Sequence, residues 1–459
     1  MKKFLVVLLS LGLIVAFGAT ASAADVKFSG SYYVVGWYAD NQTLAGDKTS
    51  SAAIWQRFRM QPVFQIAEGL TLTARFDAME KGWGSDDWRG KFDDMNLSRK
   101  QIPASGSPKV QENFEFERGY VTFKTAIGQF DVGYQSSGKW GTDFLDDEKS
   151  RPRIKFQTQM GPMVLGFVYE KQFEAYYASA AGYPNQSLKV DADNDNYSIY
   201  AIYNFTGGNT GLLYKYTDNN ASRPTAAGNY QSRLHYLAPY VKATFGPVYI
   251  ESEVDWLFGK AAEFDSAPGT DKDANAWGAY LKARVNLGPA YFGAAGMWTS
   301  GDDGSDATKK KDWSNGSGNG SQDLDVGLIL GNDALQTWQQ PGGSAIGNGG
   351  ANGFAFDSAK YNSLIVSGFA GFDVTPKLNI ESVLLWAQLD KKVKIAGIDI
   401  VSKDLGWELD ITAKYKIYDN LTYMLGAGYL WAGDAFKGNS NANSVSNDYL
   451  LMNRISLNF

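Results

Sequence analysis

The amino-acid sequence predicts an all-β fold, a transmembrane antiparallel up-and-down β-barrel of about 18 strands. Segments in which apolar and polar residues alternate recur along most of the chain, and no helical layer is left to cover their apolar faces. The connections between these segments alternate between short turns and long polar stretches. A barrel in a bilayer accounts for both observations, because lipid contacts the apolar outer face and water fills the polar lumen.

Residues 1–23 have the three regions of a cleaved secretory signal peptide. Lys2 and Lys3 form the basic start, an apolar run covers residues 4–17, and Ala21-Ser22-Ala23 has the form of a cleavage site. An N-terminal membrane anchor is the alternative, but the run is short for a span, which needs about 20 apolar residues. We therefore expect an exported chain. Loss of both lysines changes the formal net charge from −6 to −8.

The composition narrows the class of protein further. The chain has no cysteine, which excludes disulfides, thiolate metal sites and C-x-x-C-H haem attachment. After the signal peptide, no stretch approaches the roughly 18 consecutive apolar residues of a transmembrane helix. Tyr and Trp are abundant and fall near predicted strand ends, as in the aromatic belts of membrane barrels. Residues 24–459 contain no linker or break in composition, so we expect a single barrel domain.

Five segments show the strand alternation most clearly. In residues 405–417, Trp407 lies on an apolar face, and Glu408 and Asp410 lie on the opposite face. Each apolar face is about five positions long, as expected for a tilted strand that crosses the hydrocarbon. Apolar residues between 113 and 124 do not share one parity, which predicts a bulge or a strand end above the membrane. The other clear segments are 54–66, 70–81, 248–258 and 277–287.

Short turns rich in Gly, Pro and Asn occur at every second connection. The longest polar stretch, residues 301–357, contains the apolar run Val326-Gly327-Leu328-Ile329-Leu330. Membrane barrels have short turns at one end and long loops at the other, so we expect an even number of strands. Sixteen and twenty strands are alternatives, because strand boundaries read from sequence err by several residues. The turns are expected at 68–69, 126–128, 161–162, 207–209, 246–247, 288–289, 375–376 and 419–420.

The C-terminal segment, Tyr449–Phe459, alternates in the same way and ends on an aromatic residue. It resembles the closing strand of Gram-negative outer-membrane proteins. The resemblance implies that Phe459 is an assembly signal and that the barrel assembly machinery is a partner.

Two adjacent segments, Arg118–Lys124 and Gly128–Gln135, resemble the strand pair before the constriction loop of general porins, which has a similar G-x-F-D-x-G-x run. The resemblance implies a passive channel for small hydrophilic solutes and ions, surrounded by lipid in the outer membrane of a Gram-negative bacterium. The resemblance is also compatible with a homotrimer. Gln135 stands where porins with an arginine ladder often have Arg, so the ladder is not carried over whole. General porins commonly have about 16 strands, whereas about 18 are expected here. Substrate-specific channels with about 18 strands are therefore the nearest variant of the family.

Charged residues of largely inward parity predict a basic wall in the lumen that acidic residues oppose. Such opposed charges across a narrow pore filter solutes by charge, and we expect a weak preference for anions. The segment 139–148 stands where the porin constriction loop should be, and 301–357 is the rival constriction. An ordinary solvated lumen, whose charges stabilise the strands by pairing, is the alternative. The predicted site residues are the basic Arg57, Arg59, Arg75, Arg118, Arg151, Arg153 and Lys155, the acidic Glu251, Glu253 and Asp255, and the loop residues Asp143, Asp146, Asp147 and Glu148.

Motifs for other functions are incomplete. Gly133-x4-Gly138-Lys139 is followed by Trp140 where a phosphate-binding loop needs Ser or Thr. The acidic run 191–195 lacks the Gly and Glu of a calcium loop, and His235 is the only histidine. We therefore expect no enzyme activity, no cofactor, no metal and no nucleic-acid partner. The alternative function is a structural or scaffold barrel for an outer-membrane partner such as an electron-transfer complex.

Overall fold

The computed structural model describes most of the chain from Asp25 onward. The expected signal peptide and the loop residues Asp146, Asp147 and Glu148 lie outside the described residues. Within the described part, no helix is both long enough and apolar enough to cross a membrane. The described residues are 25–41, 43–44, 46, 50–83, 114–144, 149–174, 193–222, 230–265, 269–313, 324–331, 352–354, 356 and 360–459.

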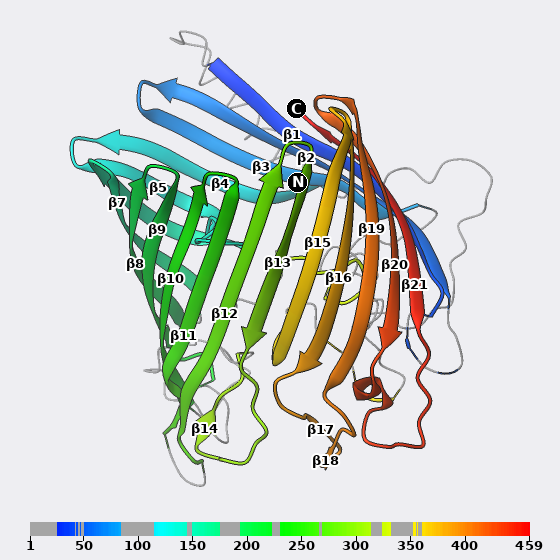
Figure 1. Ribbon diagram of the computed structural model, residues 1–459. Helices are drawn as coiled ribbons and strands as arrows, with labels where there is room; N and C mark the ends of the chain where they lie inside the picture. The colour runs from blue at the N-terminus through cyan, green and yellow to red at the C-terminus, as the bar shows by residue number, and fades with distance from the viewer. Residues whose placement is uncertain are drawn as a thin grey trace, which may run out of the picture.

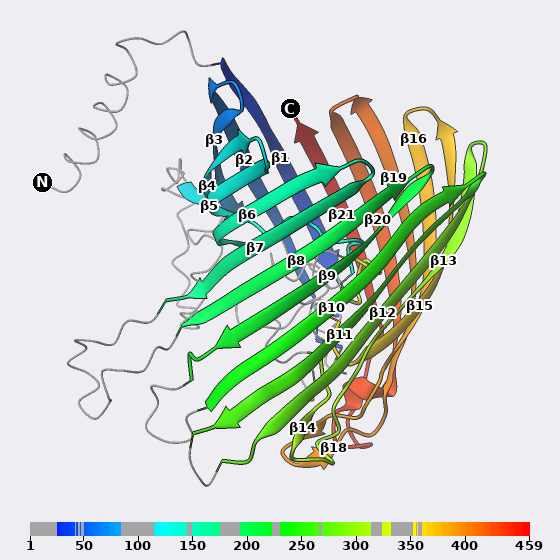
Figure 2. The same ribbon diagram turned by 90° about the vertical axis from the view of Figure 1, so that its left-hand side faces the viewer.

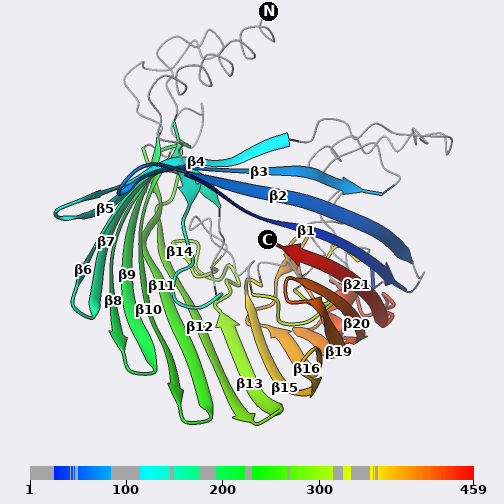
Figure 3. The same ribbon diagram turned by 90° about the horizontal axis from the view of Figure 1, so that it is seen from above.

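The long strands form one antiparallel sheet that closes on itself (Figures 1 and 3). Consecutive long strands pair, and β1 (Asp25–Ala39) pairs with β21 (Asp448–Asn458) to complete the ring. The described residues thus form an 18-stranded barrel, which confirms the predicted fold class and strand number. The short β14 (Lys309–Lys310) adds a parallel pairing to β12. The other long strands are β2 (Ser51–Ala67), β3 (Leu70–Gly82), β4 (Phe114–Thr125), β5 (Gly128–Ser136), β6 (Ser150–Met160), β7 (Met163–Phe173), β8 (Asn194–Phe205), β9 (Gly208–Asn219), β10 (Tyr230–Phe245), β11 (Val248–Phe264), β12 (Lys272–Leu287), β13 (Ala290–Thr299), β15 (Ser363–Thr375), β16 (Leu378–Leu389), β19 (Asp404–Tyr418) and β20 (Leu421–Ala432).

Short and long connections alternate, as predicted. Tight turns join strand pairs such as β2–β3 and β4–β5 at the end of the barrel that holds the C-terminus, and the long connections lie at the opposite end (Figure 1). Each predicted turn is present at or beside its expected position. Gly161, Gly246 and Gly288 adopt positive φ angles of 60°, 57° and 61°. This left-handed backbone favours glycine and explains why Gly-Pro recurs at these three turns.

Side chains alternate between an exposed outer face and an inner face. On β19, Trp407 and Ile411 are each 50% exposed on the outer face, whereas Glu408 and Asp410 on the inner face are 0% and 2% exposed. The expected irregularity in β4 is present, because the register with β3 shifts at Glu117. The break in sequence parity therefore marks a bulge, one of the two expected causes.

Aromatic rings form an arc on the outer face toward the long-loop ends of β7–β12. Tyr216, His235 and Phe258 are neighbours in this arc, with ring centres 5.2 Å and 5.1 Å apart. The hydroxyl of Tyr214 lies 2.7 Å from Nδ1 of His235. His235 therefore belongs to an aromatic belt on the outside of the barrel.

Part of the barrel interior is packed like a protein core. The connection between β13 and β15 contributes Trp313, Ile329, Leu330 and Phe356, none more than 2% exposed. They belong to one apolar cluster with Phe436 of the last long connection. Two short elements lie next to this apolar cluster at the long-loop end of the barrel (Figure 2). These elements are the hairpin of β17 (Lys394–Ile395) and β18 (Ile398–Asp399) and the 3-10 helix η1 (Asp434–Lys437).

Candidate functional site

Two chain segments inside the ring of strands narrow the lumen (Figure 3). The first is the strap, residues 137–144, which leaves β5 and contacts the inner face of β10–β12. The indole N–H of Trp140 donates to the carbonyl oxygen of Ala238 at 3.0 Å. Glu253 on β11 accepts hydrogen bonds from the backbone N–H and the hydroxyl of Thr142, each at 2.8 Å. These contacts anchor the strap at the wall of β10–β12, away from its origin at β5.

Aromatic packing holds the strap as well. The ring of Phe144 stacks on Tyr280 with centres 5.6 Å apart and is 1% exposed. The ring of Trp140 lies over the bare backbone of Gly211, where an added Cβ would approach Cη2 to 3.0 Å. A side chain at position 211 would clash first with the ring of Tyr240, which packs edge-on against Trp140, and would thus disturb the position of the strap.

The second segment is the inner segment, residues 324–331, which packs against β16, β19 and β20. Three successive backbone N–H groups, at residues 328–330, donate to the carboxylates of Glu408 and Asp410 over 2.7–3.0 Å. The strap overlaps the constriction loop expected at 139–148, and the inner segment belongs to the rival stretch 301–357. The structure therefore brings parts of both expected constrictions into the barrel.

The basic residues of β2 are paired with acids of β3. The guanidinium of Arg59 donates to both carboxylate oxygens of Asp77, at 2.6 Å and 2.5 Å. Arg57 lies 3.5 Å from Glu80, and its guanidinium carbon lies 4.9 Å from the ring centre of Tyr33. The positive charge of this part of the wall is thus largely balanced within the wall.

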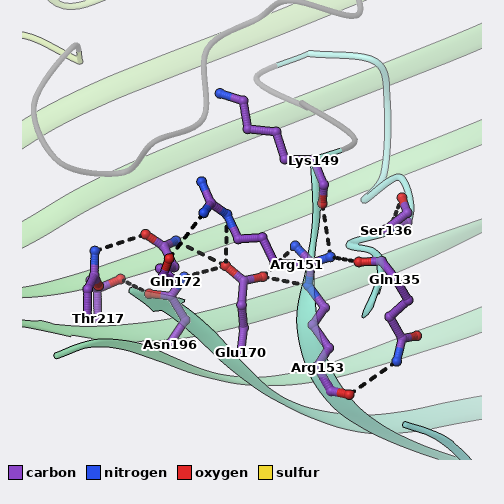
Figure 4. A network of polar contacts seen from close by, with 11 residues as sticks. Gln135, Ser136, Lys149, Arg151, Arg153, Glu170, Gln172, Asn196 and Thr217 are labelled. Carbon is purple, nitrogen blue, oxygen red and sulfur yellow. Dashed lines mark hydrogen bonds and ion pairs between the residues drawn. The ribbon is translucent and has the colours of Figure 1, made fainter. Parts of the chain in front are cut away.

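A second network links β5 to β9 (Figure 4). Arg153 is 5% exposed and donates from Nε to Glu170 at 2.5 Å and from Nη1 to the carbonyl oxygen of Gln135. Glu170 also lies 3.8 Å from Arg151 and accepts a hydrogen bond from Asn196 at 3.0 Å. These cations therefore bind neighbouring strands together as well as contributing charge.

The remaining predicted basic residues are Arg75, Arg118 and Lys155. Arg75 and Arg118 stand directly opposite each other in the β3–β4 pair, and Nε of Arg118 lies 3.4 Å from the hydroxyl of Ser150. Lys155 is half-buried and forms no ion pair with any residue that the structure describes. Its cross-strand neighbour Asp131 accepts hydrogen bonds from Thr122 and Gln129, so the ammonium of Lys155 lies beside a carboxylate that other groups engage.

Two of the three predicted acidic residues are covered by protein. Glu253 is 2% exposed beneath the strap, and Asp255 is 0% exposed and accepts a hydrogen bond from the Tyr236 hydroxyl at 2.6 Å. Glu251 accepts hydrogen bonds from Tyr280 and Tyr249 at 3.0 Å and 2.8 Å. The acidic wall is therefore mostly engaged in internal contacts.

The predicted loop acid within the described residues is Asp143. It pairs with Lys139 at 2.6 Å, and both side chains are 51% exposed. The pair lies on the strap itself, so its two charges nearly cancel there.

A cavity of about 240 Å³ lies between the strap and the inner face of β6–β10. Its wall combines charged groups, the rings of Trp140 and Tyr200, and apolar side chains including Val168 and Leu213. In the described part of the chain, no group of three or more Asp, Glu or His side chains could hold a metal ion. The charged lining residues are Lys139, Lys149, Arg151, Arg153, Lys155, Glu170, Lys215 and Glu253.

Sequence reasoning missed Glu170, the partner of Arg153, and Lys215 in the cavity wall. Both lie on strands, β7 and β9, whose alternation was not resolved into faces. The anchoring role of Glu408 and Asp410 was missed as well, although their inward parity was predicted. Backbone N–H groups supply their partners, and these groups leave no side-chain pattern in a sequence.

Phe459 lies at the seam of the barrel. Its backbone exchanges hydrogen bonds with Gly30 on β1, at 2.8 Å and 3.1 Å. Its ring stacks on Phe58 with centres 6.3 Å apart. The terminal residue thus joins the first and last strands at the short-turn end.

No family model and no curated protein matches the sequence. Solved structures do match the fold. OccK9 (OpdG) of Pseudomonas aeruginosa is 13% identical with a TM-score of 0.52, over 95% of this chain and 99% of that chain. OpdK of the same species, solved with vanillate, is 12% identical with a TM-score of 0.50, over 94% and 99%. OccK8 (OprE), also of that species, is 13% identical with a TM-score of 0.50, over 95% and 98%. The chain therefore has the fold of outer-membrane porins.

Proposed function

We propose that the protein is an outer-membrane channel of a Gram-negative bacterium through which small hydrophilic solutes and ions diffuse passively. A closed barrel with an apolar outer face and charged residues on its inner face supports this proposal. Its fold, shared with outer-membrane porins, supports it as well. Passive diffusion requires no catalytic group and no cofactor.

The cavity beside the strap carries the proposed charge preference. Six basic and two acidic side chains line it. An ion in a constriction sheds part of its bulk water and feels the wall charge most strongly there. We therefore propose a weak preference for anions. The structure of OpdK with vanillate, a carboxylate, supports the proposal that an anion is accepted by a barrel of this fold.

The predicted lumen residues keep their proposed roles as the charged lining of the solute path. Because most of the other basic residues are paired with acids, we propose that Lys155 contributes more to selectivity than each of them does. The proposed lining residues are Arg57, Arg59, Arg75, Arg118, Arg151, Arg153, Lys155, Glu251 and Asp143, whereas Glu253 and Asp255 are covered by protein and act on the path only through their contacts.

Conductance across a planar bilayer tests the channel. Purified protein is expected to give stable open steps without a partner, and a KCl gradient is expected to give a zero-current potential of the sign for anion preference. A barrel that stays closed and co-purifies with another protein would instead support a scaffold.

We further propose that Phe459 is the assembly signal and that the barrel assembly machinery reads it. Deletion of Phe459 is expected to reduce the amount of heat-modifiable barrel in cell envelopes. A normal amount in the deletion variant would contradict this role. A homotrimer is proposed from the porin resemblance alone, and the mass of the detergent-solubilised protein tests it.

A further inference from the structure

We propose that Glu408 and Asp410 are positioning residues of the channel. They hold the inner segment, residues 324–331, against the wall of the barrel. In this position the segment determines the width of the solute path and contributes one charged side chain to it. This inference rests on the proposed channel function. Neither acid was assigned such a role by the charge pattern of the sequence.

The hydrogen bonds are the first support. Glu408 receives the N–H of Ile329 at 2.7 Å and of Leu330 at 2.8 Å, one on each carboxylate oxygen. Asp410 receives the N–H of Leu328 at 3.0 Å. Each of these three N–H groups thus has its own carboxyl oxygen as acceptor, and a hydrogen bond in a low-dielectric interior is stronger than one in water.

The acids and the segment depend on one another. Glu408 is 0% exposed and Asp410 is 2% exposed, and Asp410 borders a cavity of about 220 Å³ beside the segment. A buried carboxylate is costly unless hydrogen bonds satisfy it. Oδ1 of Asp410 has no hydrogen-bond partner among the described residues, so Asp410 depends on the N–H of Leu328 at its other oxygen. Detachment of the segment would remove this donor and both donors of Glu408. The two partners therefore stabilise the inward position of the segment together.

Two glycines of β20 leave room on the barrel wall for the inner segment. An added Cβ at Gly428 would lie 2.6 Å from Oδ1 of Asp410 and 3.4 Å from Cδ1 of Ile329. An added Cβ at Gly426 would lie 3.1 Å from Cδ1 of Leu328. Both glycines are on the inner face of β20. Side chains at these positions would occupy the space that the segment fills.

Apolar packing completes the contact. Ile329 and Leu330 are 1% and 0% exposed, and Leu385 on β16 beneath them is 0% exposed. This explains the apolar run inside an otherwise polar stretch. An outer loop surrounded by water would have no use for it.

The held segment also places a charge in the lumen. Asp325 is exposed and lines a cavity of about 220 Å³ together with Lys414 and Arg454. Its carboxylate interacts electrostatically with Arg454. Release of the segment would therefore widen the path and remove one negative charge from the neighbourhood of these cations.

The decisive variant is Glu408→Gln with Asp410→Asn. An amide offers its NH₂ group where one carboxylate oxygen accepted a donor, so the hydrogen bonds to the segment are weakened at nearly constant shape. Single-channel conductance is expected to rise about twofold, because the bore widens. Asp399→Asn in the exposed β17–β18 hairpin is the matched control and is expected to leave conductance unchanged.

A steric variant approaches the same question without removing a charge. Gly428→Val retains both acids but fills the space beside Ile329 and is expected to raise conductance in the same direction. Gly296→Val is its control, because an added Cβ there has only the carbonyl oxygen of Ile365 near it, at 3.9 Å. This second variant keeps the proposal testable if the double variant fails to fold.

A thiol reporter follows the segment independently of conductance. The chain has no cysteine, so Ile329→Cys introduces the only thiol. A membrane-impermeant maleimide is expected to label it slowly in the parental barrel and about tenfold faster with Glu408→Gln and Asp410→Asn. Equal labelling rates and equal conductance in folded barrels would overturn the proposal. A parental barrel that never conducts would overturn the channel function, whereas the labelling comparison would still test the anchoring.

Discussion

The wall formed by β16, β19 and β20 is covered from inside by the inner segment, whereas the wall formed by β6–β9 faces an open cavity. On the covered wall, Leu385 and Glu408 are fully buried. On the open wall, Val168 and Lys155 keep part of their surface exposed. Both walls belong to one continuous sheet with the same apolar outer face.

The two walls satisfy their charges in different ways. The acids of the covered wall accept hydrogen bonds from the backbone of another segment, and Glu408 is the clearest case. The charges of the open wall pair with neighbours on adjacent strands, as Arg153 does with Glu170. The first arrangement controls the size of the lumen, because it holds chain inside it. The second leaves the lumen open and controls its charge.

The largest expected difference between the walls concerns packing. Leu330→Ala, against the covered wall, is expected to lower the free energy of unfolding by about 2–5 kcal/mol, because it leaves a cavity in a dry core. Val168→Ala, on the open wall, is expected to cost about 1 kcal/mol or less. Urea unfolding in lipid vesicles measures both. Equal losses would mean that the inner segment is not part of the cooperative barrel.

The second expected difference concerns ion pairs. Glu170→Gln leaves Arg153 without its buried partner and is expected to cost about 2 kcal/mol, below the usual range for fully buried pairs because water reaches the cavity. Asp143→Asn breaks the exposed pair with Lys139 and is expected to cost less than about 1 kcal/mol. The same unfolding measurement compares them. A larger loss for Asp143→Asn would show that the strap pair matters more than its exposure indicates.

A smaller effect is expected on selectivity. Lys155→Gln removes a cation without an ion pair from the open wall and is expected to lower the anion-to-cation permeability ratio about twofold. Arg233→Gln removes a cation that lies on the outer face and pairs with Glu263 at 3.4 Å, and it is expected to leave the ratio unchanged. The zero-current potential under a KCl gradient reports the ratio. A shift in the control alone would place the selective charges outside the lumen.

The smallest effect is expected at the outer acids of the connection after β13. Hydrogen bonds from the side chain and backbone of Ser305 lower the pKa of Asp303, and those of Thr308 lower the pKa of Asp306. Both carboxylates therefore stay charged at neutral and mildly acidic pH. Because the Debye length is about 8 Å at physiological salt, Asp303→Asn with Asp306→Asn is expected to leave selectivity unchanged there.

Salt concentration provides the control for this last expectation. At low ionic strength the Debye length grows to about 30 Å, so the same double variant is expected to shift the zero-current potential slightly. A large shift at high salt would mean that these acids lie close to the narrowest part of the path.

Local sequence patterns predicted most of the fold. The alternation around Trp407 and the Gly-Pro turn at Gly288 depend on neighbouring residues only, so the strands and turns were predictable from the chain itself. The bulge at Glu117 was predictable for the same reason, since an extra residue breaks the parity of its own strand.

The lumen was less predictable because its contacts join distant residues. Thr142 and Glu253 are separated by 111 positions, and Ile329 and Glu408 by 79. Position along a strand predicts that Arg153 faces inward, but not that Glu170 on the next strand neutralises it. Charge assignments from parity therefore overestimated the free positive charge of the basic wall.

The seam between β1 and β21 has a consequence for the time course of folding. It joins the two ends of the chain, and the backbone of Asn41 bonds Asp448 across 407 positions. Contacts of such high sequence separation form slowly, because a long loop must close before they contribute. Until the last strand is in place, the growing sheet has two unpaired edges that other chains can join. Closure is therefore expected to be the late, rate-limiting event, and aggregation competes with it throughout the preceding interval.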